Sequence, residues 1–294
     1  MQVMIMPNKT LANGFSLPVL GFGTWQLGGK MERDPQNDDA GDIDSIRAAI
    51  NAGITHIDVA ENYAHGHTEE LVAEAIKSSR RSTLTLASKL SPDNQDKNSV
   101  RKSLVASLKR LHTDYLDLYL LHSPNYQIPV EETMAEMDKL MDEGLIRNIG
   151  VSNFSVKQMQ RAQSATTYPI VANQVHYNLM DREMEHSGVL QYCQFHDIIL
   201  IAYRPLQKGI VLEMGEQFLN PLREKYNKTS AQIALNWLIG QKNVVTIPRM
   251  RSLKHLEENL GSVGWCLDPE DMQMLRINFP NQKKISDVHP LREW

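Results

Sequence analysis

The sequence contains few cysteines, no excess of charge and no long apolar run, and each shortage excludes a class of protein. Its 294 residues include two cysteines, Cys193 and Cys266, which are too few for a disulfide framework and have no metal-like spacing. We expect two free thiols, as in a reducing compartment; the alternative is a single disulfide between them. The 31 basic and 35 acidic residues give a net charge of −4, which argues against a nucleic-acid or polybasic membrane partner.

Export and membrane signals are also missing. The apolar residues 1–6 end at Pro7 and Asn8 and carry no basic segment, which is not typical of a signal peptide. No apolar run approaches the roughly 18 residues that span a bilayer. These features predict a soluble, cytoplasmic protein.

Familiar ligand-binding motifs are incomplete. Residues 21–23, Gly-Phe-Gly, continue as Thr-Trp-Gln at 24–26 and lack the third glycine of the dinucleotide fingerprint, which argues against a doubly wound nucleotide domain. The His-Gly-His of residues 65–67 has no third ligand at a recognised spacing, so we expect no metal. The acidic stretch 34–42 does not match the EF-hand spacing, and we interpret it as a mobile, solvated loop.

What the sequence does contain is a regular alternation of short apolar runs and amphipathic segments. The runs have the nearly continuous apolar character of parallel strands that are buried on both faces. They are 19–23, 55–60, 84–90, 115–121, 146–151, 170–175, 198–202 and 244–247. The helical patterns are 42–52, 68–78, 99–111, 130–143, 155–165, 182–196, 230–240 and 252–260. This alternation predicts an α/β fold, a (β/α)8 TIM barrel that forms a single domain over residues 1–294.

Two additions to the barrel are expected at its ends. The Asn13-Gly14 pair predicts a β-hairpin within residues 3–17, which could close the floor of the barrel. Asp268 before Pro269 predicts a capped start for an extra C-terminal helix, which a tail over residues 283–294 follows. Within the barrel, Thr229 or Ser230 and Ser252 are expected to cap helices.

Polar side chains stand at the C-terminal ends of the predicted strands, where barrels of this type carry their active sites. Asp58, Lys89 and His122 end the second, third and fourth strands, and Gln174 lies in the sixth. Each has a structural explanation: a cap or ion pair for the aspartate, solvent exposure for the lysine, and core hydrogen bonding for the other two. Because buried ionisable groups are costly unless paired, a shared rim accounts for them better.

This set of residues suits carbonyl reduction. Tyr63, five residues after Asp58, is the predicted proton donor, and a neighbouring lysine is expected to lower its pKa from about 10 toward the working pH. The aspartate would hold the lysine, and His122 would orient a carbonyl oxygen or relay a proton. No side chain can supply hydride, so a cofactor is required. A glycosidase pair of Asp58 and Glu61 would leave Lys89 unexplained.

Three motifs resemble the aldo-keto reductase family, and the resemblance runs from residues 21–25 to 258–259. The motifs are Ile-Asp-Val-Ala-Glu-Asn-Tyr at 57–63, Leu-Asp-Leu-Tyr-Leu-Leu-His at 116–122 and Gly-Leu-Ile-Arg-Asn-Ile-Gly-Val-Ser-Asn-Phe at 144–154. The resemblance implies an NAD(P)H-dependent reductase that converts aldehydes or ketones to alcohols. Its catalytic tetrad would be Asp58, Tyr63, Lys89 and His122.

The resemblance also implies how a nicotinamide cofactor is held. Ser152, Asn153 and Gln174 match residues that bind the carboxamide, and Tyr203 matches the ring that stacks on the nicotinamide. The implied cofactor contacts are Gly23, Thr24, Trp25, Ser152, Asn153, Gln174, Tyr203, Arg204, Pro205, Leu206, Arg249, Arg251, His255, Glu258 and Asn259. The last two match adenine contacts, and Trp25, Tyr63 and His122 would line the substrate pocket.

Two departures from the family pattern concern the cofactor and the pocket. Arg249 stands where many relatives have lysine, and His255 stands where many have the arginine that binds the adenosine 2′-phosphate. Arg249, Arg251 and Lys254 could supply charge there, so NADP(H) is expected over NAD(H). Ser123 replaces a tryptophan after the catalytic histidine, which implies a more open or more polar pocket.

Several functions and features stay open. The chain could instead be a cofactor-binding regulatory subunit of a membrane protein, or a barrel hydrolase or lyase, although the complete tetrad favours turnover. We expect a small carbonyl compound as the substrate, and a monomer or weak oligomer. Trp294 could fold over the pocket or hang free, and the natural substrate is not indicated.

Overall fold

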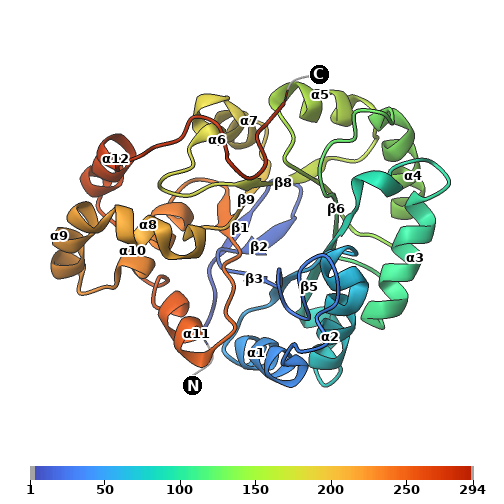
Figure 1. The fold of residues 1–294 in the computed structure, drawn as a ribbon. Helices are drawn as coiled ribbons and strands as arrows, with labels where there is room; N and C mark the ends of the chain where they lie inside the picture. The colour runs from blue at the N-terminus through green and yellow to red at the C-terminus, as the bar shows by residue number, and fades with distance from the viewer. Residues whose placement is uncertain (1–3, 293–294) are drawn as a thin grey trace.

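The computed structural model describes residues 4–292, in which eight parallel strands form one curved sheet (Figure 1). The strands are β3 (Phe22–Gly23), β4 (His56–Asp58), β5 (Thr85–Leu90), β6 (Leu118–Leu121), β7 (Ile149–Ser152), β8 (Ile170–His176), β9 (Ile199–Tyr203) and β10 (Val244–Thr246). They follow one another in chain order. A parallel bridge from Leu20 to Thr246 joins the first strand region to the last, so the sheet closes into the predicted barrel.

Helices surround the barrel and follow the predicted segments closely. They are α1 (Asp39–Asn51), α2 (His67–Ile76), α3 (Val100–Leu111), α4 (Val130–Asp142), α5 (Val156–Ser164), α10 (Ser230–Ile239) and α11 (Leu253–Leu260). Thr229 and Ser252 cap α10 and α11 through their side chains, as expected, and Thr229 forms a capping box with Gln232.

The predicted helix over 182–196 is wrong in its continuity. It is divided into α6 (Glu183–His186) and α7 (Val189–Phe195), because Gly188 between them has a left-handed φ of 77°. Two helices were not predicted: α8 (Ile210–Met214) and α9 (Glu216–Tyr226). Pro221 inside α9 hides that helix from a propensity argument, since proline usually interrupts a helix.

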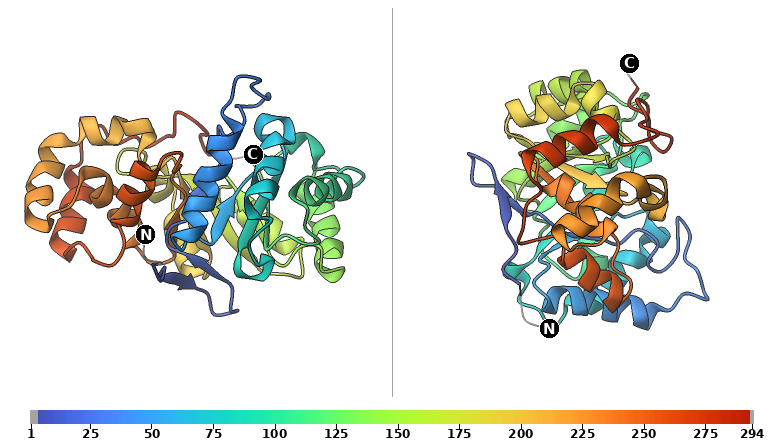
Figure 2. Two further views of the ribbon diagram at one scale, coloured as in Figure 1. Left: turned by 90° about the horizontal axis from the view of Figure 1, so that it is seen from below. Right: turned by 90° about the vertical axis from the view of Figure 1, so that its left-hand side faces the viewer.

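The N-terminal hairpin lies at the floor of the barrel. β1 (Asn8–Thr10) pairs with β2 (Ser16–Pro18), and the side chain of Asn13 accepts a hydrogen bond from the Phe15 amide in the turn. Leu11 and Leu17 are buried in one cluster with the side chains that fill the barrel. The Ala12 amide donates to Asp197, which precedes β9 and so marks the N-terminal end of the strands. The hairpin and the loop before α1 lie on opposite sides of the molecule (Figure 2).

An extra helix, α12 (Pro269–Asn278), follows the eighth unit as predicted. Asp268 precedes it but does not cap it; its carboxylate pairs with Lys225 of α9 at 2.8 Å instead. The chain then runs back across the molecule toward α6 and α5 (Figure 1). Backbone hydrogen bonds between Lys283 and residues 180 and 182 fix this tail.

Candidate active site

Lys89 is the centre of a buried polar cluster at the C-terminal rim of the barrel. Its side chain is fully buried, and Nζ donates to Asp58 Oδ1 at 2.6 Å, to the Val59 carbonyl at 2.9 Å and to the Tyr63 hydroxyl at 3.2 Å. β4 and β5 pair in parallel, so their C-terminal ends meet at one edge. The structure therefore brings together three of the four residues proposed for catalysis.

Tyr63 follows a tight turn after β4 and opens the 3-10 segment Tyr63–Gly66. Ala64 and His65 both have left-handed backbones, with φ of 48° and 54°, and the Ala64 amide donates to the Lys30 carbonyl at 2.7 Å. The Tyr63 ring packs edge-on against Trp25, with centroids 4.9 Å apart. Trp25 and Tyr63, two of the three predicted pocket residues, thus lie in contact.

Lys89 lowers the pKa of Tyr63, as expected, but the expected net fall toward the working pH is wrong. Burial raises the pKa of Tyr63 by more than the Lys89 ammonium lowers it, so the pKa stays above its usual value. Burial alone would lower the pKa of Lys89, but the Asp58 and Tyr63 oxygens outweigh it and raise that pKa. At neutral pH the phenol carries its proton, and the lysine stays charged.

His122 completes the cluster from the end of β6. Its ring lies 5.7 Å from that of Tyr63, centroid to centroid. Burial, helped by the charge of Lys89, holds the pKa of His122 well below 6.5, so the imidazole is neutral at neutral pH. Within residues 4–292, its Nδ1 is buried and has no hydrogen-bond partner. A neutral ring here can orient a carbonyl oxygen without adding charge.

Amide and hydroxyl groups form a second cluster beside the first. The Ser152 hydroxyl donates to the Gln174 carbonyl, and Asn153 Nδ2 donates to Ser152 Oγ and to the His122 carbonyl. The Tyr203 hydroxyl donates to Asn153 Oδ1 at 2.9 Å. All four predicted nicotinamide contacts therefore lie together at the ends of β7, β8 and β9.

One contact between the two clusters was not expected. Gln174 Nε2 donates to Asp58 Oδ2 at 2.7 Å. Asp58 thus accepts from Lys89 on one oxygen and from Gln174 on the other. The polar period of β8 could have placed the glutamine at the rim, but no sequence signal reveals its partner across the barrel.

The predicted adenine-side residues divide into two groups. Arg249 Nη1 donates to the neutral Gln26 side chain at 2.7 Å. Arg251 instead pairs with Asp42 at 2.6 Å and donates to Asn37 at 2.7 Å. A phosphate would therefore have to compete with Asp42 for Arg251. His255, Glu258 and Asn259 lie on α11, with the imidazole exposed and the asparagine buried.

The remaining predicted contacts lie at the ends of β3 and β9. Thr24 is fully buried, and its hydroxyl donates to the Asp58 carbonyl at 2.8 Å. The loop after β9 begins with Arg204, whose φ is 50°. Gly23 ends β3 and Trp25 follows two residues later, while Pro205 and Leu206 continue the β9 loop.

The segment 34–42 was expected to be a mobile, solvated loop, but one of its residues is buried and anchored. Most of it is exposed, but Asp42, already inside α1, is fully buried. Its carboxylate accepts from the Gly28 amide and Asn37 Nδ2 in addition to its pairing with Arg251. The loop is thus fastened to the segment after β10.

Two groups near the rim were missed by the sequence reasoning. The His176 ring stacks on Tyr203, with centroids 5.6 Å apart and planes 11° apart. His289 from the tail lies edge-on to the same tyrosine at 6.4 Å. His176 follows Gln174 by two residues on β8, so strand alternation could have found it. The tail position had no such signal, and Trp294 lies outside the described residues.

Comparisons with known proteins identify the family of the chain. The profile of the aldo/keto reductase family matches residues 19–277. Methylglyoxal reductase YeaE of Escherichia coli is 35% identical over 91% of this chain and 93% of its own length. Aldo-keto reductase YhdN of Bacillus subtilis is 34% identical over 93% of both chains.

Solved structures are similar over almost the whole chain. The thermostable aldo-keto reductase Tm1743, in complex with the inhibitor epalrestat, superposes with a TM-score of 0.89 at 42% identity and covers 92% of this chain and 99% of its own. An aldo-keto reductase from Klebsiella pneumoniae in complex with NADPH gives a TM-score of 0.83 at 34% identity and covers 96% of this chain and 98% of its own.

Both cysteines are free, and within residues 4–292 no helix is long and apolar enough to cross a bilayer.

Proposed function

This chain belongs to the aldo/keto reductase family, and we propose that its buried tetrad protonates a carbonyl oxygen while an NADPH cofactor reduces the carbon. The protein is an oxidoreductase that reduces small carbonyl compounds and binds NADP(H). The observation that carries the proposal is the bridge from Asp58 through Lys89 to the Tyr63 hydroxyl.

The rim offers groups of the right chemistry for a nicotinamide. One face of the Tyr203 ring packs on His176, and the residue is only partly buried. Beside it lie the amides of Asn153 and Gln174, which offer both donors and acceptors. A planar aromatic surface next to two amides fits a flat ring that bears a carboxamide. When bound, the cofactor supplies the hydride that no side chain can provide.

The protein's own residues would manage the proton and the developing charge. Tyr63 holds its proton at neutral pH and would give it to the substrate oxygen as that oxygen becomes an alkoxide. Lys89 would stabilise the phenolate that remains, and Asp58 fixes the lysine in place. The neutral His122 would orient the carbonyl oxygen toward Tyr63. In the oxidation direction the phenolate would act as base.

We infer a preference for NADPH over NADH from the charge near α11. Arg249 is exposed, and within residues 4–292 its side chain donates to the neutral Gln26. Arg251 already faces Asp42. We therefore expect Arg249→Gln to reduce the NADPH-to-NADH ratio of kcat/KM by about tenfold, as for loss of a charge-assisted hydrogen bond. Arg251→Gln is the matched control and should change this ratio less; the reverse order would contradict the assignment.

We propose small aldehydes and dicarbonyls as substrates. One similar enzyme is named for methylglyoxal reduction, and Ser123 occupies the position after His122 without adding a large side chain. The test follows the near-ultraviolet absorbance of NADPH with methylglyoxal, 4-nitrobenzaldehyde and xylose, and repeats the series with NADH. Turnover of a carbonyl with NADPH is expected. No turnover with either nucleotide, despite binding of NADPH, would contradict the proposal.

A further inference from the structure

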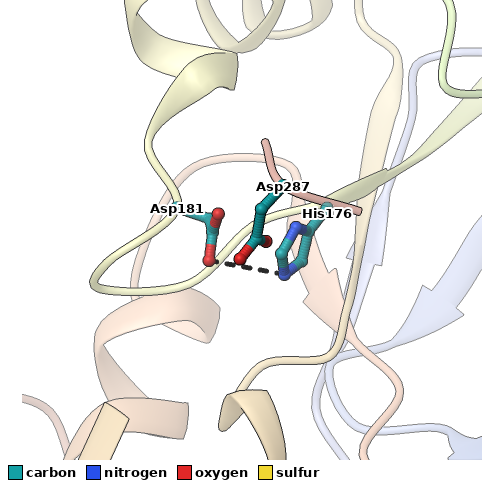
Figure 3. Close-up of side chains that lie close together, drawn as sticks. All are labelled: His176, Asp181 and Asp287. Carbon is teal, nitrogen blue, oxygen red and sulfur yellow. Dashed lines mark ion pairs between the residues drawn. The ribbon is translucent and has the colours of Figure 1, made fainter. Parts of the chain in front are cut away.

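Three potential metal ligands converge behind the Tyr203 ring. His176 ends β8, Asp181 lies in the turn that follows, and Asp287 comes from the C-terminal tail; the three side chains point toward one another (Figure 3). Their ligand atoms all lie within 4.8 Å of one another. His176 and Asp181 are fully buried, whereas Asp287 is exposed and leaves a route from solvent. None of the three is needed for the chemistry at Tyr63.

The surroundings of His176 Nε2 are rich in oxygen acceptors. Gln207 Oε1 lies 3.0 Å from this nitrogen, and Asp181 Oδ2 lies 3.5 Å away. A single N–H could satisfy only one of them. The Asn178 amide, 3.3 Å from both the nitrogen and Asp181 Oδ2, is the one neutral donor nearby.

Asp181 supplies an independent observation. Its carboxylate is fully buried, and its Oδ1 has no hydrogen-bond partner among the described residues. Among the described residues its one ion-pair neighbour is His176. A buried carboxylate is costly unless a cation compensates it.

The other ring nitrogen of His176, Nδ1, lies 2.8 Å from the Ser286 hydroxyl. Ser286 Oγ also accepts from the amides of Val288 and His289, so without a cation its O–H donates to Nδ1 and the ring proton on Nε2 faces Gln207. A cation on Nε2 would move the ring proton to Nδ1, the nitrogen that a metal-bound histidine usually directs to such an oxygen. Ser286 is itself held by Glu183, which accepts from its backbone amide at 3.0 Å.

We propose that His176, Asp181 and Asp287 bind one divalent transition-metal cation, with the side-chain oxygen Oε1 of Gln207 as a fourth donor. One imidazole nitrogen with carboxylate and amide oxygens suits Zn²⁺ or Mn²⁺. The cation must displace the Lys283 ammonium, which pairs with Asp287 at 2.6 Å. Bound there, it would join the tail to β8 and hold the ring on which Tyr203 stacks.

The group around His67 shows why proximity of acids alone is not sufficient. His67 also contacts two carboxylates, Asp39 at 2.7 Å and Glu70 at 2.8 Å. Each acid binds a different ring nitrogen, so the two oxygens and one free nitrogen cannot converge on a single ion. Glu70→Gln therefore provides a matched control at a histidine with similar neighbours.

The test is calorimetric titration of the full chain with ZnCl₂, followed by Co²⁺ absorption spectroscopy to identify nitrogen and oxygen ligands. We expect one Zn²⁺ per chain and a raised Tm when it binds. Asp287→Asn, an exposed change that should not disturb folding, should weaken binding at least about tenfold, as should Ser286→Ala. His176→Gln and Asp181→Asn should abolish the site.

Two further variants make the result decisive. Lys283→Met removes the competing ammonium and should tighten Zn²⁺ binding several-fold, whereas Glu70→Gln should leave it unchanged. The proposal is overturned if the wild-type chain binds no stoichiometric cation, or if Asp287→Asn and Lys283→Met both bind as the wild type does. Because the readout is metal binding, failure here would leave the proposed reductase activity untouched.

Discussion

The two ends of the barrel interior differ sharply in chemistry. At the floor, Leu11 and Leu17 of the hairpin pack with apolar side chains from the strands, such as Leu118 and Ile199. At the rim, the interior ends in a charged pair, Lys89 with Asp58, both almost inaccessible to solvent. The same strands therefore bury apolar groups at one end and ionised groups at the other.

This difference separates stability from function. Burial of apolar area stabilises the floor, and the leucine and isoleucine side chains that fill it cannot hold or move a proton. The rim pair gains Coulomb energy but loses hydration, so the intact pair contributes little net stability. Removal of one partner lowers stability strongly, because the other charge is left buried and unpaired. Such a pair is retained for what it does to Tyr63 rather than for the fold.

Removal of the rim cation should have the largest effect. Lys89→Met leaves Asp58 buried and unpaired, so we expect the free energy of unfolding to fall by about 3–5 kcal/mol, measured by urea denaturation. Turnover should also be lost, and the alkaline limb of any residual activity should move to higher pH, because the ammonium that lowers the Tyr63 pKa is gone. Wild-type stability and an unchanged pH profile would remove Lys89 from the account.

Truncation at the floor should damage stability alone. Leu17 is fully buried, and Leu17→Ala should lower the free energy of unfolding by about 2–5 kcal/mol through lost burial and a cavity. The kcat of the folded fraction should stay within about twofold of wild type, since the cavity lies at the opposite end of the barrel from Tyr63. A large fall in kcat at temperatures where the variant is folded would blur the distinction between the two ends.

A smaller effect is expected from His56, which lies on β4 two residues below Asp58. Burial lowers the pKa of His56 to about 4, and neither ring nitrogen has a partner among the described residues. Between pH 6.5 and 4 the imidazole binds a proton in the unfolded chain but not in the folded chain. The free energy of unfolding therefore decreases as the pH falls through this window, by up to about 3 kcal/mol. Above pH 6.5 this penalty is absent.

The control for that pH dependence is His56→Leu. Urea denaturation at pH 7.5, 6 and 5 should show a shallower loss of stability in the variant than in the wild type. Equal slopes would show that other groups cause the acid sensitivity, and that the middle of the barrel accommodates a charged imidazole.

The contrast between the two ends also explains what the sequence could reveal. The strands and most helices were predictable because Val, Ile and Leu runs and amphipathic periods are local signals. The rim set was predictable because Asp58, Lys89 and His122 each interrupt an apolar strand at its end. The hairpin at the barrel floor was predictable from the turn at Asn13-Gly14.

The failures share a physical cause, which is dependence on distant neighbours. The pKa of Tyr63 depends on the balance between burial and Lys89, and a sequence gives only the second. The Arg251–Asp42 pair joins segments more than 200 residues apart. Pro221 lies inside α9, where a proline normally argues against a helix. Gly188 divides α6 from α7, although the amphipathic pattern continues across it.

The central claim is that the rim chemistry ends at the Tyr63 hydroxyl, and Tyr63→Phe tests it most directly. The variant keeps the ring that packs on Trp25 and loses only the oxygen. Measured together, NADPH binding by fluorescence should be unchanged, and kcat for a reactive aldehyde should fall by about 10²–10⁴-fold, as expected for loss of a general acid. Turnover close to that of the wild type would contradict the assignment of Tyr63 as proton donor.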